Sequence, residues 1–331
     1  MIGRVDVALG LRPRAAWRVP WTLLIFLATL TLPWVGSRYD TFIGTQIAIY
    51  SLFAMSLNLL LGTTGLVSFG HAAYFGIGSY GCGILMKMLG VPFWLSFPAA
   101  GLIAAAFGFF CVRLTKIYFA MLTLAFAQIV WVICFKWNEV TGGDQGLPDV
   151  PFPELSWLGS LPGFTHFRIG ELFYVLTLVL VALCIAMLRR LTDSPFGRVL
   201  TTIRENPERA ASIGVNVRAY ELAAFTIAGG FAGLSGALFG IFNRGVFADF
   251  VFWSKSADVM IMTILGGMQH FWGPAVGALV LTLLNQQITA FTEYWPFVLG
   301  TILVVLLFAF PGGILGALEA ALSRILKRRD A

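Results

Sequence analysis

Residues 40–87 decide the fold and read DTFIGTQIAIYSLFAMSLNLLLGTTGLVSFGHAAYFGIGSYGCGILMK. Between Asp40 and Lys87, the 46 residues at positions 41–86 include no Asp, Glu, Lys or Arg. A transmembrane helix needs about 20 apolar residues, and a charge at the bilayer centre is costly. An uncharged stretch of this length therefore predicts two consecutive membrane-spanning helices.

The composition of the whole chain agrees with a membrane protein. Of its 331 residues, 58% are apolar and 11% are charged, and the mean hydropathy is +0.85, whereas a soluble domain carries about 25% charged residues. These values exclude a soluble enzyme, a secreted disulfide scaffold and a disordered chain. The net charge of +6 is not gathered on one soluble face, so no nucleic-acid partner is expected. The four cysteines lie in apolar stretches without a CxxC pair, so no metal site is expected. The predicted fold class is an all-α polytopic membrane protein.

Other charge-free gaps give the remaining spans. One span is predicted in each of six gaps, at positions 19–37, 88–112, 117–135, 172–188, 222–243 and 294–318. The 34 residues at positions 259–292 hold either one long tilted helix or two short ones.

The distribution of basic residues resolves this ambiguity. Four segments, 1–18, 113–116, 189–219 and 319–331, hold 16 of the 22 Lys and Arg residues. Since basic loops stay on the cytoplasmic side, we place all four there and the acidic loop 138–170 outside. Both termini on one side require an even number of crossings, so 259–292 is predicted to be two spans that break near 270–274. The chain then has ten transmembrane helices in a single domain at 19–318, with cytoplasmic basic tails at 1–18 and 319–331. No A-x-A-like cleavage site follows the first apolar run, so a retained helix is expected rather than a signal peptide.

Ten crossings permit an inverted repeat. The second to fifth spans and the seventh to tenth start on opposite sides of the membrane, which is the parity of such repeats. The Gly, His and aromatic residues of 65–76 also echo those of 266–277. We therefore expect an inverted repeat.

Two glycine-rich regions, 62–83 and 229–277, invite two interpretations. Small residues let helices pack closely in a membrane, and this is the favoured interpretation of 229–277, which contains two GxxxG motifs. In the first region, we expect Gly65 to Gly78 to be a broken or re-entrant segment that lines a solute path, because glycine lets the backbone leave the helix. The candidate path residues are Ser68, Gly70 and His71, with Asn58 and Gln128 as secondary candidates. The alternative is that these glycines only allow tight packing.

Other membrane functions find less support. No predicted span carries an acidic residue at its centre, which disfavours ion-coupled carriers and channels with charged rings. The three histidines are scattered and form no catalytic cluster, so an enzyme is not expected.

The loop that follows the sixth span contains the sequence SPFGRVLTTIRENPERAASIG at residues 194–214. Ser194-Pro195 and Asn206-Pro207 are helix-start signals, and Gly214 is a helix stop. The loop thus predicts two short amphipathic helices outside the membrane. They either lie on the lipid surface or dock a partner protein.

This loop carries a resemblance to a known family. Glu208-x-Ala210-x3-Gly214 resembles the EAA-x3-G loop by which ABC-importer permeases engage their ATPase, although Arg209 replaces the second residue and the hydrophobic-Pro tail is absent. The wider chain is similar to the LivM-type permeases of branched-chain amino-acid ABC importers. The matching stretches are 58–62, 65–78, 118–124, 141–147, 194–214, 257–267 and 311–313.

The resemblance implies an ABC-importer permease fold and a set of partners. These are a second, LivH-type permease, two ATPase subunits and a periplasmic or lipid-anchored solute-binding protein, all at the bacterial inner membrane. The chain has no G-x-x-x-x-G-K-[ST] motif, so no cofactor is expected in it and a partner would hydrolyse ATP. The residues implied in coupling are Pro195, Phe196, Gly197, Arg198, Glu205, Glu208, Ala210 and Gly214.

The implied substrates are leucine, isoleucine and valine, although relatives carry urea, amides, other amino acids or aromatic acids. The alternative function is an ATP-independent carrier or facilitator for small polar solutes.

Overall fold

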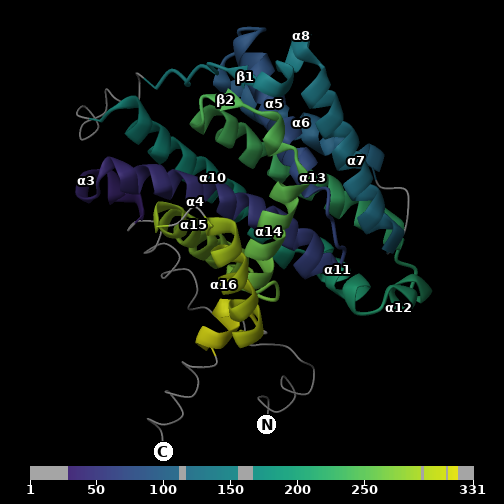
Figure 1. The fold of residues 1–331 in the computed structure, drawn as a ribbon. Helices are drawn as coiled ribbons and strands as arrows, with labels where there is room; N and C mark the ends of the chain where they lie inside the picture. Colours follow the sequence, from purple (N-terminus) through teal and green to yellow (C-terminus); the bar gives the residue numbers. More distant parts are fainter. Residues whose placement is uncertain (1–28, 112–116, 156–166, 292–293, 311, 320–331) are drawn as a thin grey trace, which may run out of the picture.

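The computed structural model describes residues 29–111, 117–155, 167–291, 294–310 and 312–319, and most of them are helical (Figure 1). The predicted tail at 1–18, most of the first predicted span, and all but the first residue of the predicted tail at 319–331 lie outside the described residues. The main helices are α3 (Leu32–Val35), α4 (Arg38–Asn58), α5 (His71–Lys87), α6 (Phe93–Cys111), α7 (Ile117–Lys136), α10 (Ile169–Asp193), α11 (Pro195–Glu205), α12 (Pro207–Ser212), α13 (Val217–Phe242), α14 (Trp253–Gly266), α15 (Gly273–Phe291) and α16 (Trp295–Ala309).

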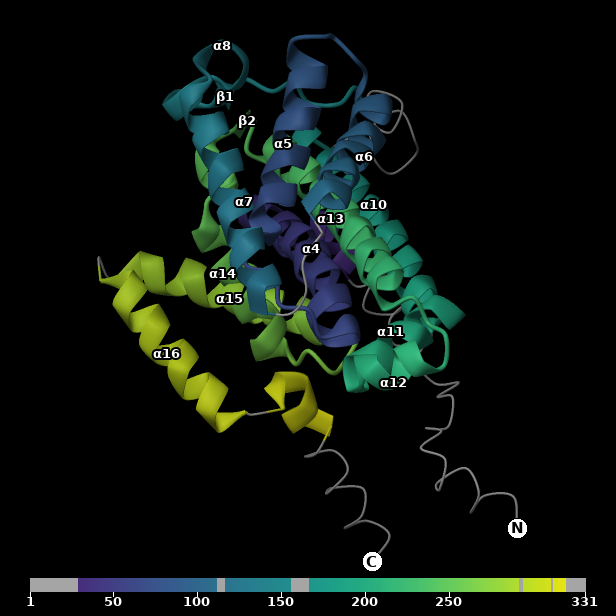
Figure 2. The same cartoon turned by 90° about the vertical axis from the view of Figure 1, so that its right-hand side faces the viewer.

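Short elements complete the fold. They are the π-helix η2 (Leu59–Thr64), α8 (Asn138–Thr141), the 3-10 turns η3 (Gly143–Gln145) and η4 (Ala248–Phe250), and the strands β1 (Leu147–Pro148) and β2 (Gly245–Val246). The strands pair antiparallel, with Leu147 opposite Val246. They lie at the opposite end of the molecule from α11 and α12 (Figures 1 and 2). We call these two ends the strand end and the α11–α12 end.

The helices α5, α6, α7 and α13 run between these two ends, whereas α14, α15 and α16 lie in the half nearer to α11 and α12 (Figures 1 and 2). At the strand end, Lys87 at the end of α5 donates a hydrogen bond to the Pro148 carbonyl, at 2.6 Å. Toward the α11–α12 end, the first residue of α5, His71, lies beside Ser56 of α4. A polar contact between Gln286 of α15 and Gln46 of α4, at 3.3 Å, shows that α15 runs toward the start of α4.

Close contacts at glycine hold the centre of the bundle together. A Cβ atom on Gly78 of α5 would overlap the backbone of Gly233 on α13, and one on Gly236 would overlap the Phe75 carbonyl. Gly233 likewise leaves room for Ala104 of α6. The packing interpretation of the GxxxG motifs in 229–240 is therefore confirmed, since their glycines let α13 touch the backbones of its neighbours.

The prediction that residues 65–78 form one broken segment is correct only in its first half. After η2, Gly65 adopts a left-handed conformation with φ of 79°, and residues 65–70 are not helical. From His71 onward the chain is the regular helix α5. The glycines of α5 serve packing, because Gly76 lies against Val251 and Gly78 against Gly233.

Two helices occupy the interval 259–292, as the parity of charges predicts. The helices α14 and α15 are separated by residues 267–272, where Gly267 has φ of 110°. The start of α14 was predicted wrongly, however. Lys255 and Asp258 lie inside α14 rather than at its border, and Lys255 contacts Tyr50, twelve residues into α4. Asp258 is therefore an acidic residue inside a helix, at a position that the charge pattern takes as the edge of a span.

Length and composition identify fewer spans than the ten predicted. Within the described ranges, three helices qualify, Arg38–Thr64, Ile169–Asp193 and Val217–Phe242. A fourth qualifies if Ala120–Lys136 and Asn138–Gln145, bent by 78°, form one span. Others are too short or too polar, since α14 has 14 residues and α15 contains Asn285, Gln286 and Gln287.

The two segments of the predicted sequence echo, 65–76 and 266–277, lie at different connections between helices. Residues 65–70 join α4 to α5, whereas 267–272 join α14 to α15. If α4–α7 corresponds to α13–α16, the equivalent of 59–70 is the segment 243–252 that leads into α14. The shared Gly, His and aromatic character therefore arises from two different turns.

Candidate functional site

The predicted double helix between α10 and α13 is present, and its caps are those that the sequence indicates. The Ser194 hydroxyl accepts a hydrogen bond from the Gly197 amide at the start of α11, where Pro195 is the first helical residue. The Asn206 side chain accepts one from the Arg209 amide, at 2.9 Å, and starts α12. Gly214 ends the unit with φ of 89°, a conformation that favours glycine.

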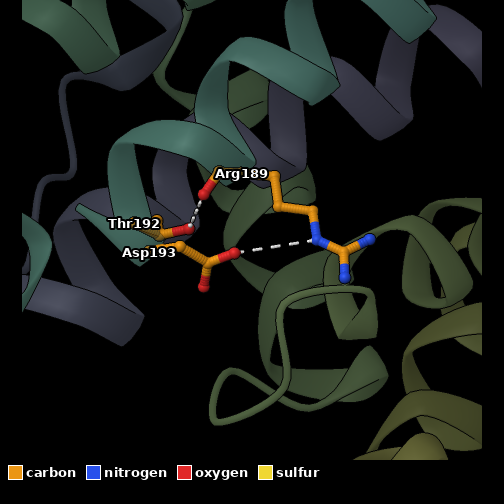
Figure 3. A network of polar contacts seen from close by, with 3 residues as sticks. All are labelled: Arg189, Thr192 and Asp193. Carbon is orange, nitrogen blue, oxygen red and sulfur yellow. Dashed lines mark hydrogen bonds and ion pairs between the residues drawn. The ribbon is translucent and has the colours of Figure 1, made fainter. Parts of the chain in front are cut away.

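The junction of α10 and α11 is tightly built. On the last turn of α10, the Arg189 guanidinium lies 3.8 Å from the Asp193 carboxylate, and the Thr192 hydroxyl donates to the Arg189 carbonyl at 2.9 Å (Figure 3). A Cβ atom on Gly197 would overlap the Thr192 carbonyl, so only glycine allows this close turn. The direction of α11 relative to α10 is therefore fixed by local contacts.

One face of this α11–α12 unit is anchored and the other is open. Leu200, Ile203 and Ala210 are buried, and Phe196 stacks on Tyr220 of α13 with ring centroids 5.6 Å apart. The opposite face exposes charged side chains and one large apolar side chain, namely Arg198, Glu205, Glu208, Arg209 and Ile213. Such a face, outside the helix bundle, is suited to bind a partner surface.

A contact that could not be predicted from the sequence joins α11 to the non-helical break after α4. The Arg204 guanidinium donates a hydrogen bond to the Gly62 carbonyl in η2, and the Arg204 side chain also packs against Gly65. Nothing in the sequence distinguishes Arg204 from the other arginines of the loop, because its partner is a backbone carbonyl 142 residues away in the chain.

A cavity of about 770 Å³ lies between the break and the α11–α12 unit. Its wall combines the exposed apolar side chains Val67 and Phe69 with charged ones from α11, α12 and α13. The charged residues are Arg204, Glu208, Arg218 and Glu221. Among the predicted coupling residues, Glu208 therefore contributes to this cavity.

The predicted path residues lie elsewhere, and their side chains do not line this cavity. Ser68, Gly70 and His71 are buried together at the start of α5, and Asn58 is buried at the end of α4. Gln128 lies half-buried on α7, so it is not part of the cluster at the break.

One nitrogen of the His71 ring has a hydrogen-bond partner. Ser56 Oγ lies 2.7 Å from the Phe53 carbonyl and 2.9 Å from His71 Nε2, so it joins the two. The other ring nitrogen, His71 Nδ1, has no partner among the described residues. Asn58 Oδ1 and Ser68 Oγ are also buried without a partner there.

Comparison with known proteins gives a consistent family. Residues 41–307 match the family model described as "Branched-chain amino acid transport system / permease component". The chain is 32% identical over 315 residues to the high-affinity branched-chain amino acid transport system permease protein LivM of Escherichia coli K12, covering 88% of this chain and 74% of that protein. It is 30% identical to the LivM protein of Salmonella typhimurium LT2, with the same coverage of both chains.

A second group of relatives consists of LivH proteins. The chain is 26% identical over 298 residues to the probable branched-chain amino acid transport permease protein LivH of Methanocaldococcus jannaschii, covering 83% of this chain and 91% of that protein. No solved structure matches the chain. A family match that spans most of an all-α chain with membrane-spanning helices, together with two LivM relatives at 30% identity or more, leads to one conclusion: the chain belongs to the permease components of branched-chain amino acid transport systems.

Proposed function

We propose that this chain is one of two permease subunits of an importer of branched-chain amino acids in the bacterial inner membrane. A LivH-type chain would be the second permease, since relatives of both types exist. Two ATPase subunits would hydrolyse ATP, so this chain would need no cofactor, and an external binding protein would deliver the solute. Both termini and the α11–α12 unit would face the cytoplasm.

The α11–α12 unit is the observation that carries the proposal. A plain connection between two spans needs only a few residues, yet this one forms two capped helices with an exposed charged face. Its hydrogen bond from Arg204 to Gly62 gives a direct route from that face to the broken end of α4. Through this hydrogen bond, a conformational change of a docked ATPase would be transmitted to the membrane domain.

Ten crossings and an inverted repeat are part of the proposal. In the described part of the chain, nine helices of 14 residues or more follow the first predicted span and support nine further crossings, namely α4, α5, α6, α7, α10, α13, α14, α15 and α16. The repeat is supported by α5 and α14, which would be equivalent. Each follows an irregular segment, and their first turns meet where the Ala72 amide donates to the Ser256 hydroxyl at 2.9 Å.

We also propose that the break at 65–70 borders the solute path. The buried atoms Asn58 Oδ1, Ser68 Oγ and His71 Nδ1 support this role, since a buried polar atom without a hydrogen bond is costly. A passing solute or water would supply the missing partners when the segment opens. Gln128, half-buried on α7, remains a secondary candidate.

An ATP-independent carrier is the second candidate function. The ion pair of Lys255 and Asp258, at 3.6 Å, favours it, because carriers use ionisable groups at membrane depth. Reconstitution separates the two functions. An importer requires the ATPase and binding protein for leucine uptake, whereas a carrier takes up leucine without them.

Substitutions in the α11–α12 unit test the coupling role. In proteoliposomes that hold both permeases and the ATPase, Glu208→Lys and Gly214→Pro are expected to uncouple ATP hydrolysis from uptake while membrane insertion persists. Glu139→Lys makes the same charge change at the exposed strand end and is the matched control. Normal uptake by both α11–α12 variants would contradict the assignment.

A further inference from the structure

We infer that the outward face of the first two turns of α14, formed by Ser254, Lys255 and Asp258, binds the ammonium and carboxylate groups of an α-amino acid in the solute path. The inference rests on the proposed function for its substrate class. Its physical basis is a charged pair that the fold places deep in the bundle, where the sequence predicts a membrane border.

Contacts with two helices give the depth of this face. Lys255 Nζ donates to the Tyr50 hydroxyl at 3.3 Å, and Tyr50 lies twelve residues after Arg38, or about 18 Å along α4 at 1.5 Å per residue. Val251, just before α14, packs on Gly76. Gly76 lies eleven residues before Lys87, or about 16 Å from the strand end. Both helices therefore place the start of α14 near the middle of the membrane.

Lys255 and Asp258 use only part of their hydrogen-bonding capacity within the described residues. Lys255 Nζ lies 3.6 Å from Asp258 Oδ2, longer than the 2.7–2.9 Å of a typical charge-assisted hydrogen bond. An ammonium has three donors, and in the described part of the chain two of them are directed at Tyr50 and Asp258. Asp258 makes no other polar contact there. The pair therefore keeps one free donor beside a carboxylate oxygen that is free to accept.

This face is open rather than enclosed. The Asp258 side chain is 48% exposed and that of Lys255 is 26% exposed. Ser254 is also exposed, and it shares the face of Asp258 because it lies four residues before it. A carboxylate half-exposed to lipid at mid-membrane would be costly, and ionisable residues in spans almost always face a bundle interior or a water-filled cavity. The face therefore borders a water-filled cavity, and another subunit is needed to complete the wall of that cavity.

The Lys255 ammonium and the Asp258 carboxylate are complementary in charge to the carboxylate and ammonium groups of an amino acid. The solute carboxylate would accept from Lys255 Nζ and its ammonium would donate to Asp258, so each charge would gain a further partner. Trp253, which is 48% exposed, and the half-buried Ile261 offer apolar surface beside the pair for an aliphatic side chain. The sister permease would close the opposite side of the site.

Cysteine labelling tests whether the face is wet and whether it binds solute. Ser254→Cys is expected to react with a charged methanethiosulfonate reagent in the assembled complex, and excess leucine should slow the reaction about tenfold. Leu102→Cys, at a 71% exposed apolar position of α6, is the control for a lipid-facing side chain. Reaction of Ser254→Cys at the Leu102→Cys rate, or at a rate unchanged by leucine, would overturn the inference.

Uptake supplies a second measurement. Asp258→Asn keeps the size of the side chain and is expected to lower leucine uptake about tenfold or more, because it removes one charged hydrogen bond to the solute. Asp149→Asn makes the same change at an exposed position of the strand end and should leave uptake unchanged. Wild-type uptake by Asp258→Asn would overturn the site.

The wild-type result separates the two proposals. Failure of the intact complex to take up leucine would refute the proposed function. Labelling with and without leucine would still decide the site.

Discussion

Replacing Arg204 by alanine should uncouple the two ends of the importer without unfolding either. The Arg204 guanidinium holds the Gly62 carbonyl and also lines the cavity beside α12. A hydrogen bond from a charged group contributes about 1.5–3 kcal/mol. Arg204 is largely exposed, so we take the lower value. A loss of about 1.4 kcal/mol corresponds to a tenfold change in an equilibrium constant.

The expected result is therefore about a tenfold fall in leucine transported per ATP hydrolysed. The assay is paired measurement of uptake and phosphate release in proteoliposomes that hold both permeases and the ATPase. Arg204→Lys should recover part of the loss, since it keeps a charge but not the guanidinium fork.

Arg189→Ala is the matched control. It removes an arginine whose contact is Asp193 on its own helix, at 3.8 Å, so it should change coupling little (Figure 3). If Arg204→Ala transports as much leucine per ATP as the wild type, the link from α11 to η2 plays no part in coupling.

Three further changes test the packing, the path and the topology. Gly236→Ala should destabilise the detergent-solubilised protein by about 1–3 kcal/mol, because its Cβ would meet the Phe75 carbonyl, whereas Gly300→Ala, where nothing lies near, should not. His71→Phe keeps the ring that stacks on Phe53 and removes the polar atoms, so uptake should fall while thermal stability holds; unchanged uptake would leave His71 a packing residue. In sealed cells, Asp144→Cys should react with an external reagent and Ser212→Cys should not, and the reverse pattern would invert the topology.

The α11–α12 unit was predictable because its signals are local. Ser194 and Asn206 cap helices only a few residues away, and Gly214 needs only its own φ angle. Such caps depend on neighbours in the sequence, so their position could be predicted to within a few residues. The break between α14 and α15 was instead predicted from the parity of charged segments, near 270–274, and it lies at 267–272.

For features that depend on residues far away in the sequence, the alternatives could be predicted but the choice between them could not. The sequence indicates that Gly78 and Gly236 serve either packing or flexibility, but the choice depends on Gly233 and Phe75 lying opposite them. Arg204 has no sequence signal at all, since it binds a backbone carbonyl. The predicted path residues Ser68 and His71 lie beside the break, but which way their side chains face depends on the surrounding helices.

The misplaced border at α14 shows where reasoning from charges reaches its limit. Such reasoning takes each charged residue as the edge of a span, because an isolated charge in lipid is costly. Here the chain leaves β2 at the strand end and descends beside α5 to Val251 before α14 begins. This segment contains the 3-10 turn η4, Ala248–Phe250, and covers part of the depth that a helix would otherwise cover. Lys255 and Asp258 are thereby carried into the bundle, where Tyr50 and each other reduce the cost of their charges. A span made of a 3-10 turn and half a helix would still count as one crossing, so the predicted number of crossings does not depend on where this border lies. What changes is the position of Lys255 and Asp258, which lie inside α14 rather than at its border.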